Sequence, residues 1–207
     1  MDDHAVVREG LAELINQTAD LMICGDASSA EEALQKLAAA RPDVVIIDLV
    51  LGEMGGLELV KTLKTQSPEL LILVLSMHDE TYYAERCLRA GAKGYIMKKE
   101  AIEQVENAVR TVLDGKVYLS KAMSEQFLLA VTRGDPTRVV SPVNRLTDRE
   151  LEVFECIGQG LGASEIAKKL KLSVKTIESY QAKLKEKLHL KDSSQLFQHA
   201  LHWVEHR

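Results

Sequence analysis

The sequence predicts a parallel α/β domain followed by an all-α domain. In residues 1–116, short apolar runs alternate with amphipathic helical patterns, which is typical of βα units that build a parallel sheet with helices on both faces. The run at 44–47, Val-Val-Ile-Ile, indicates a strand buried on both sides. Residues 117–143 contain Gly134, Pro136 and Pro142, and only helical patterns follow them. We therefore expect a first domain at 1–116, a linker with one helix at 117–143, and a helical domain at 144–207.

Each element of the first domain has its own signal. Amphipathic periodicity predicts helices at 6–15, 29–40, 57–65, 80–89 and 102–113, and short apolar runs predict strands at 21–25, 44–47, 70–75 and 95–97. Ser29 is a typical N-cap with glutamates in the turn after it, and Pro42 follows the end of the same helix. In the rest of the chain, helices are expected at 120–131, 148–157, 163–170, 174–188 and 193–204.

Composition restricts the class of protein. The 207 residues are 46% apolar and 28% charged, which is ordinary for a soluble globular protein. No stretch approaches the ~18 consecutive apolar residues that span a bilayer, and the acidic start lacks the basic-then-apolar pattern of a secretory signal. The three cysteines form no CxxC pair, which fits free thiols in a reducing compartment. We therefore expect a cytoplasmic protein with no membrane partner.

The charges are unevenly distributed along the chain. The net charge of −5 alone argues against binding to nucleic acid. However, residues 168–191 contain eight lysines and two glutamates, a local balance of +6, whereas the rest of the chain has 18 basic and 29 acidic residues, a balance of −11. A short cationic patch on an acidic body is expected for a contact with a phosphate backbone, although a solvated helix face would show the same charge.

Polar side chains follow three of the predicted strands. Asp48 comes directly after the strand at 44–47, Ser76 after 70–75 and Lys98 after 95–97. Because the carboxyl ends of parallel strands meet at one edge of a sheet, where ligands bind, we expect these groups to converge there. Asp2 and Asp3 precede the first helix, and they join the same edge if a strand comes before them.

This set of groups indicates metal-assisted phosphoryl chemistry. Clustered carboxylates repel one another and need a cation, and oxygen ligands suit Mg²⁺, which also binds phosphate oxygens. An aspartate beside that ion can attack phosphorus and become an aspartyl phosphate, while a lysine and a hydroxyl hold the phosphoryl oxygens. Each residue taken alone is more often an ordinary loop or cap residue, so the prediction depends on their occurrence together.

The first domain resembles the receiver domain of two-component response regulators over residues 2–115. The matching residues are the acidic pair in Asp2-Asp3-His4, Asp48 in Ile46-Ile47-Asp48-Leu49, the turn Gly55-Gly56-Leu57, Ser76, and Lys98 in Gly94-Tyr95-Ile96-Met97-Lys98. The resemblance implies a flavodoxin-like sheet in the order 2-1-3-4-5. It also implies that Asp48 accepts phosphate from a sensor histidine kinase, that Lys98 contacts the phosphoryl group, and that Ser76 and Tyr95 form a switch pair. Asp2, Asp3 and Asp48, with the backbone carbonyl of Val50, would hold Mg²⁺.

Two features depart from the receiver pattern. Leu51 and Gly52 stand where the family usually has methionine and proline, and neither side chain does chemistry. The family also has a hydrophobic strand before the acidic pair, whereas this chain begins at Met1-Asp2-Asp3, so that first strand is missing. We expect that the native protein starts upstream, with Met1 where valine is common, because a bacterial GUG codon encodes valine internally and methionine at a start. An intact mass above that of these 207 residues would support this expectation.

The second domain carries the pattern of a helix-turn-helix. Thr147 and Glu150 have capping-box spacing, and a short helix at 163–170 is followed by Ser173, which can cap a long helix at 174–188. The second helix of such a pair enters the major groove of DNA. We expect Ile177, Leu184 and Leu188 to share the buried stripe of this helix.

The opposite side of the long helix is expected to face DNA. The candidate DNA-binding residues are Lys175, Thr176, Glu178, Ser179, Tyr180, Ala182 and Lys183. Lysines suit phosphates, whereas Glu178, Ser179 and Ala182 could reach base edges. Glu178 could instead pair with a neighbouring lysine, and Thr176 could simply belong to the helix cap.

Residues 144–204 resemble the helix-turn-helix of LuxR/NarL/FixJ regulators. The matching segments are Leu146-Thr147-Asp148-Arg149-Glu150, Ser164-Glu165-Ile166-Ala167 and Ser173-Val174-Lys175-Thr176-Ile177-Glu178-Ser179. Tyr180 stands where histidine is common, and its hydroxyl can still reach phosphate. The resemblance implies a four-helix module that binds double-stranded DNA as a homodimer, often through its last helix.

These features together predict a phosphorylation-dependent DNA-binding transcription regulator that accepts phosphate on Asp48 but turns over no diffusible substrate. An alternative is an atypical, phosphorylation-independent regulator whose shortened receiver serves only for dimerisation. An enzyme that uses Asp48 and Mg²⁺ for phosphoryl hydrolysis fits less well, because Val50 stands where a second catalytic aspartate would be expected. A quorum-type ligand sensor also fits poorly, because only 4% of the residues are aromatic.

Overall fold

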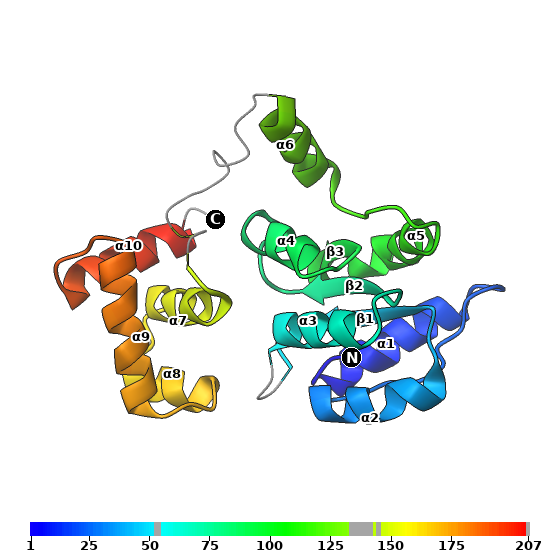
Figure 1. The fold of residues 1–207 in the computed structure, drawn as a ribbon, viewed down its shortest axis with the longest axis horizontal. Helices are drawn as coiled ribbons and strands as arrows, with labels where there is room; N and C mark the ends of the chain where they lie inside the picture. Colours follow the sequence, from blue (N-terminus) through cyan, green and yellow to red (C-terminus); the bar gives the residue numbers. More distant parts are fainter. Residues whose placement is uncertain (52–54, 133–142, 144–145, 206–207) are drawn as a thin grey trace. The chain divides into compact units, whose positions relative to one another are not determined.

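The computed structural model describes residues 1–51, 55–132, 143 and 146–205, and its chain divides into two compact units at 1–128 and 129–207 (Figure 1). Residues 133–142 of the linker expected at 117–143 lie outside the described residues. No helix in the described ranges has both the length and the apolar character needed to cross a bilayer. The three cysteines are free thiols, with Cys24 exposed and Cys87 and Cys156 buried.

A parallel three-stranded sheet forms the centre of the first unit. Its strands are β1 (Val44–Asp48), β2 (Leu71–Ser76) and β3 (Gly94–Met97), in the order β1-β2-β3. The register pairs Ile46 with Leu73 and Leu75 with Ile96. The predicted strands at 44–47, 70–75 and 95–97 are therefore confirmed to within a residue or two at each end.

Helices connect the strands where the periodicity predicted them. In the first unit they are α1 (Ala5–Asn16), α2 (Ala30–Ala40), α3 (Gly56–Gln66), α4 (Glu80–Arg89), a 3₁₀ turn η1 (Lys98–Glu100) and α5 (Ala101–Leu113), and α6 (Lys121–Thr132) extends from this unit past its end at residue 128. Side chains cap three of these helices, because Ser29 accepts the backbone N–H of Glu32, Asp79 accepts that of Thr81, and Ser120 accepts that of Met123. The capping signal at Ser29 therefore marks the true start of α2.

The core of the first unit lies on both faces of the sheet. On one face, Leu73, Leu75 and Ile96 pack with apolar residues of α1 and α5. On the other face, Ile72 and Val74 are also completely buried, while α3 contacts β1 and α4 contacts β3. Since β2 is buried on both sides, its side chains form a continuous apolar run instead of an alternating pattern.

The prediction of a strand at 21–25 is wrong. These residues are assigned to no strand, and the sheet has three strands instead of the full 2-1-3-4-5 set. Among the described residues, Met1 takes the position beside β1: its amine donates to the Ile46 carbonyl at 2.9 Å and its carbonyl accepts the Asp48 N–H at 3.0 Å. The segment at 21–25 therefore has no neighbouring strand with which to form a ladder, and apolar residues alone do not make a strand.

Residues 146–205 of the second unit form four helices. They are α7 (Asp148–Gly158), α8 (Ala163–Lys169), α9 (Val174–Lys187) and α10 (Ser193–Glu205). Thr147 and Glu150 form the predicted capping box at the start of α7, and the Ser173 side chain caps α9. The buried core includes Leu151, Phe154, Ile166, Ile177, Leu184 and Trp203. The receiver-like α/β fold followed by a helical helix-turn-helix domain is thus as the sequence predicted.

Candidate functional site

A lysine and two buried aspartates meet at the carboxyl edge of the sheet. Asp48 is the last residue of β1, and Lys98 follows β3 directly. The Lys98 ammonium lies 2.7 Å from Oδ2 of Asp48 and 2.6 Å from Oδ2 of Asp2. Asp2 and Asp48 are only 1% and 2% exposed. Short ion pairs between buried groups are screened little by solvent, so the three charges form one electrostatic unit.

Burial and ion pairing shift the pKa values of Asp48 and Lys98 in opposite directions. Burial raises the pKa of Asp48 above its ordinary value of 3.8, although the hydrogen bond from Lys98 works against that rise. Burial also disfavours the Lys98 ammonium, but hydrogen bonds to Asp2 and Asp48 outweigh it and raise the pKa of Lys98. The charge on Asp48 therefore depends on its cationic neighbours.

The acidic residues have the donor set of a cation site. One ligand atom from each of Asp2, Asp3, His4 and Asp48 lies within 4.8 Å of the others. Oδ1 of Asp48 is buried and accepts no hydrogen bond from the described part of the chain. Three carboxylates against one ammonium leave two negative charges, and carboxylate oxygens are preferred ligands of Mg²⁺. The residues present therefore fit a divalent ion. Val50, whose carbonyl was expected to join them, lies two residues after Asp48 and is half-exposed.

The side chains of Ser76 and Tyr95 both form hydrogen bonds with the backbone of His78. Both side chains are fully buried. The Ser76 hydroxyl accepts the His78 N–H at 3.1 Å, and the Tyr95 hydroxyl donates to the His78 carbonyl at 2.8 Å. Burial raises the pKa of Tyr95 well above 10, so its phenol stays protonated and can donate. The expected switch residues are thus joined through the loop between β2 and α4, and His78 is the link that the sequence did not reveal.

Gly56 allows α3 to begin against the end of β1. A Cβ at this position would lie 1.9 Å from the carbonyl oxygen of Asp48. The Gly56 N–H also donates to the Leu49 carbonyl at 2.8 Å. Only glycine permits such a close approach, which places the start of α3 against the backbone of Asp48 and Leu49.

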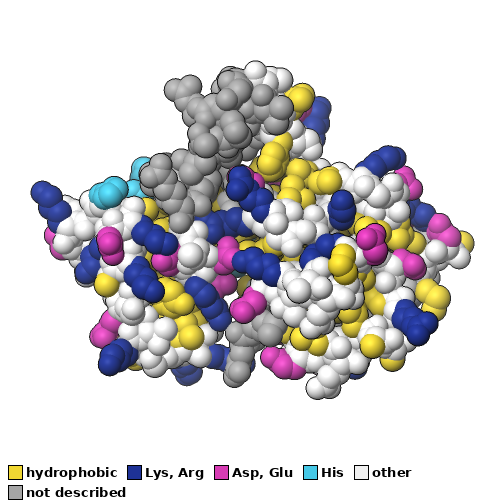
Figure 2. All heavy atoms as spheres, in the orientation of Figure 1, with side chains coloured by type: hydrophobic (Ala, Val, Ile, Leu, Met, Phe, Trp, Pro, Cys, Tyr) yellow, Lys and Arg dark blue, Asp and Glu magenta, His cyan; other side chains and the backbone are white. Residues whose placement is uncertain are grey.

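The face of α9 predicted to meet DNA is open to solvent in the second unit. Ile177 and Leu184 are fully buried and Leu188 is 9% exposed, as the stripe predicted. The candidate DNA-binding residues are either exposed (Lys175, Glu178, Ser179, Ala182 and Lys183) or half-buried (Thr176 and Tyr180). In the region where Figure 1 draws α8 and α9, Figure 2 shows several Lys and Arg side chains at the surface.

Individual residues of α9 clarify the open alternatives. The Glu178 side chain is exposed on α9, and both a contact with a base edge and a pairing with a neighbouring lysine stay predictions. The Thr176 N–H donates to Ser173 Oγ at 3.1 Å, and the two hydroxyls lie 2.7 Å apart, so Thr176 does belong to the helix cap. The Lys183 ammonium lies 5.8 Å from the centre of the Tyr180 ring, within the range of a cation–π contact.

Two side chains near these sites, those of His4 and Lys187, were not predicted from the sequence to have a role. His4 lies with its Nδ1 2.7 Å from Asp3 Oδ1, and its position directly after two acidic residues was the available signal. Lys187 of α9 donates to the buried Glu150 of α7 at 2.7 Å, a pair 37 residues apart for which the sequence carries no signal. This pair tethers α9 to α7 in the second unit.

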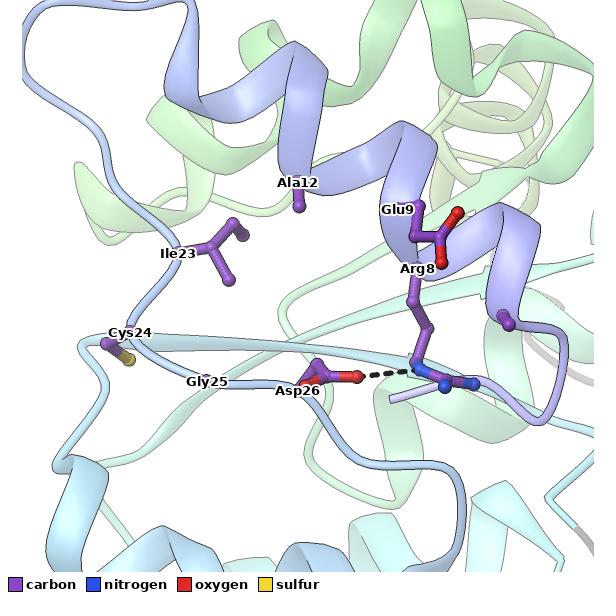
Figure 3. Close-up of a pocket in the computed structure, with 8 residues that line it drawn as sticks. Arg8, Glu9, Ala12, Ile23, Cys24, Gly25 and Asp26 are labelled. Atoms are coloured by element: carbon purple, nitrogen blue, oxygen red, sulfur yellow. Dashed lines mark hydrogen bonds and ion pairs between the residues drawn. The ribbon is translucent and has the colours of Figure 1, made fainter.

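A separate hollow of about 370 Å³ lies between α1 and the segment at 23–26 (Figure 3). Arg8 of α1 and Asp26 of the segment form an ion pair across it, with 2.8 Å between Nε and Oδ2. These two charged groups satisfy each other, so neither is left to bind a ligand. We therefore keep the carboxyl edge of the sheet as the candidate site of this unit.

The fold and the two sites define the class of two-component response regulators, with a receiver followed by a DNA-binding domain. The family model described as response regulator receiver domain matches residues 1–110, and that of bacterial regulatory proteins of the luxR family matches residues 144–200. The chain belongs to the response regulators with a LuxR-type DNA-binding domain.

Individual relatives match nearly the whole chain. The oxygen regulatory protein NreC of Staphylococcus epidermidis is 38% identical over 206 residues, covering 97% of this chain and 94% of that protein. RcsB of Salmonella enterica serovar Typhimurium, solved on a promoter with the phosphomimetic BeF₃⁻, is 25% identical with a TM-score of 0.65, covering 96% of this chain and 95% of that chain. A structure of two RcsB dimers on two parallel DNAs is 26% identical with a TM-score of 0.57, covering 95% and 93%.

This protein is accordingly a phosphorylation-dependent DNA-binding transcription regulator and not a classical enzyme. The alternative of a phosphorylation-independent regulator is not favoured, because both domains are matched and the relatives extend over the full chain.

Proposed function

We propose that Asp48 is the phospho-acceptor and that a sensor histidine kinase is its donor. The observation that carries this proposal is the position of the Asp48 carboxylate, buried at the end of β1 with the Lys98 ammonium 2.7 Å away. The receiver would comprise residues 1–116, the linker residues 117–143 and the DNA-binding domain residues 144–207. A nucleophilic carboxylate oxygen and a nearby cation are what phosphoryl transfer to a carboxylate requires.

The transfer step follows from these groups. A carboxylate oxygen of Asp48 forms the new bond to phosphorus as the bond from phosphorus to the donor imidazole breaks, and the donor keeps the electron pair. Lys98 stabilises the charge on the phosphoryl oxygens, and the Ser76 hydroxyl is the second group of this edge that can hold them. Bound by Asp2, Asp3, Asp48 and the Val50 carbonyl, Mg²⁺ would neutralise negative charge on both reactants.

Phosphorylation of Asp48 would be transmitted through Ser76 and Tyr95, which both bond to His78. Once Ser76 turns its hydroxyl to a phosphoryl oxygen, it no longer accepts the His78 N–H at 3.1 Å. The loop that also holds Tyr95 then prefers a different arrangement, which shifts the population of receiver states. This shift favours a homodimer that presents two DNA-binding domains to double-stranded DNA.

The exposed face of α9 is the proposed DNA contact. Lys175 and Lys183 would bind phosphates, with Thr176 and Tyr180 beside them, while Glu178, Ser179 and Ala182 would lie near base edges. RcsB provides a precedent, since it has been solved as dimers on DNA and on a promoter with a phosphomimetic. Because DNA and the kinase domain are intracellular partners, we propose a cytoplasmic location.

Phosphorylation of the intact chain tests the proposal. The wild-type protein is incubated with Mg²⁺ and acetyl phosphate and measured by intact mass, beside Asp48→Asn and an EDTA-treated sample. We expect one phosphoryl adduct on the wild type only, and peptide mapping after borohydride reduction should locate it at Asp48. An adduct of equal yield on Asp48→Asn would refute the assignment of the acceptor.

A further inference from the structure

The start of the linker is attached to the first unit by several hydrogen bonds. The Tyr118 N–H donates to the Lys93 carbonyl at 2.9 Å, and the Tyr118 carbonyl accepts the Tyr95 N–H at 3.0 Å, so the chain runs along the edge of β3. The Tyr118 hydroxyl also donates to Oε1 of Gln104 in α5 at 3.2 Å. The path from the first unit toward α6 is therefore held close to Ser120, the residue before the helix.

A single hydroxyl joins the start of α6 to the start of α4. The Ser120 hydroxyl donates to the carboxylate of Glu80, in the first turn of α4, and its oxygen accepts the Met123 N–H at 3.1 Å. A serine hydroxyl has one proton to donate and two lone pairs. Because its proton points to Glu80, the lone pairs are left for the Met123 N–H. Glu80 thus orients the side chain that caps α6.

Helix α6 depends strongly on this cap. It has 12 residues, and of its described side chains only that of Met123 is buried, while Leu128 and Leu129 are exposed. Helices of this length are marginal in water unless they bury an apolar face. Since α6 buries little, the hydrogen bonds at its start contribute a large share of its stability.

Glu80 also belongs to the segment that contains the switch loop. It lies two residues after His78, whose N–H donates to Ser76 Oγ at 3.1 Å. Between them, the Asp79 carboxylate accepts the Thr81 N–H at 2.8 Å, which ties the loop to the first turn of α4. A change in the bond between Ser76 and His78 should therefore displace Glu80.

We propose that Glu80 is a positioning residue that couples the phosphorylation site to the linker through Ser120. When Ser76 turns to a phosphoryl oxygen and releases His78, the start of α4 shifts, Glu80 leaves Ser120, and α6 loses its oriented cap. The bond between Glu80 and Ser120 then stabilises only the receiver state of low DNA affinity. This inference rests on the proposed function because phosphorylation of Asp48 is the trigger, and it adds the route by which the signal leaves the receiver.

Hydrogen exchange of the full chain in Mg²⁺, with and without BeF₃⁻, tests the coupling. Exchange is measured by mass in peptides from the loop at 76–79 and from α6 at 121–129. In the wild type, BeF₃⁻ should speed exchange in α6 by about fivefold, the effect of losing one cap. In Glu80→Ala, α6 should exchange faster already without BeF₃⁻. Glu80→Gln keeps an acceptor for the Ser120 hydroxyl and should behave as the wild type.

DNA affinity separates coupling from a local effect on α6. Without BeF₃⁻, Glu80→Ala should bind a promoter fragment selected by the wild type about threefold or more tightly than the wild type, and its gain from BeF₃⁻ should shrink by the same factor. Glu85→Ala, which removes a carboxylate of the same helix that pairs with Arg89, is the matched control and should change neither value.

The outcomes distinguish this coupling from the phosphorylation on which it depends. If BeF₃⁻ raises the DNA affinity of the wild type but leaves exchange in α6 unchanged, the inference is wrong while the proposed function stands. The same conclusion holds if Glu80→Ala responds to BeF₃⁻ as the wild type does. If BeF₃⁻ changes neither exchange in the loop at 76–79 nor DNA affinity, the inference and the proposed function both fail.

Discussion

At the scale of single residues, Asp48 shows a conflict between stability and function. Its carboxylate is buried at the edge of a packed sheet, and burial raises its pKa despite the neighbouring Lys98 ammonium. The charge on Asp48 therefore costs the receiver stability at neutral pH, which is common where a reactive group is held ready for a partner. A bound cation should recover part of this cost.

We predict that Asp48→Asn stabilises the protein in metal-free buffer at pH 7, by about 0.5–2 kcal/mol. Because the folded-state pKa is raised, the folded protein binds more protons than the unfolded chain between pH 3.8 and that pKa, and stability falls as pH rises through this window. The advantage of the asparagine variant should thus shrink toward pH 4. Denaturant unfolding at several pH values measures it, and a variant less stable than the wild type at pH 7 would contradict the argument.

At the scale of elements, the connection from β1 to α3 sets the position of the acceptor. A Cβ at Gly56 would meet the Asp48 carbonyl oxygen, which is backbone and has little freedom to move away. In contrast, Gly10 lies within α1, where an added Cβ has no neighbour within 4 Å. Substitution of Gly56 therefore reports the cost of a steric clash with the backbone, whereas substitution of Gly10 reports helix propensity alone.

We expect Gly56→Ala to destabilise the receiver by about 3 kcal/mol, because the helix start or the strand end must shift. Gly10→Ala should instead stabilise it by about 0.5–1 kcal/mol, since alanine favours the helix. Thermal or denaturant unfolding of both variants gives the comparison. Similar stabilities for the two variants would show that the close approach at Gly56 does not constrain the fold.

Helix α9 carries one lysine that is paired with α7 and others that are exposed to solvent. Lys187 is committed to the buried Glu150 and tethers the helix to α7, whereas Lys175 and Lys183 lie on the exposed face. Charge on α9 therefore has two different roles, and only the exposed lysines are expected to contact phosphates.

Removal of those exposed charges should change the salt dependence of DNA binding. For Lys175→Gln and Lys183→Gln we predict that the slope of log affinity against log salt concentration decreases by about 1 for each lysine that neutralises a phosphate. Lys116→Gln, an exposed lysine in the first unit, is the control and should leave the slope unchanged. Fluorescence anisotropy between 50 and 200 mM salt measures the slope, and an unaltered slope in both α9 variants would exclude them as phosphate contacts.

At the scale of the whole molecule, local sequence patterns predicted the features that depend on interactions between residues near one another in the chain. The helices and three strands follow from periodicity and caps, and Asp48 and Lys98 converge because parallel strands end at the same edge. The segment at 21–25 was mispredicted because a strand needs a hydrogen-bonded neighbour, which periodicity does not report. The Glu150–Lys187 pair and the role of His78 depend on tertiary packing between distant segments, so no local pattern could reveal them.

The first unit also ties the start of the linker to the switch region. Tyr118 pairs with the edge of β3, through hydrogen bonds of 2.9 and 3.0 Å to Lys93 and Tyr95. The Ser120 hydroxyl bonds the carboxylate of Glu80, in the first turn of α4, and also caps α6. The chain that leads to the second unit is therefore attached next to the loop that joins Ser76 to Tyr95.

The central claim is that phosphoryl chemistry at Asp48 controls DNA binding, and the affinity of the full chain for DNA tests it most directly. A promoter fragment selected by the wild-type protein is titrated with wild type and Asp48→Asn, each with Mg²⁺ alone and with Mg²⁺ plus BeF₃⁻. We expect BeF₃⁻ to raise the DNA affinity of the wild type by about tenfold or more and to leave that of Asp48→Asn unchanged. Equal affinity of the wild type with and without BeF₃⁻, or an equal gain in Asp48→Asn, would contradict it.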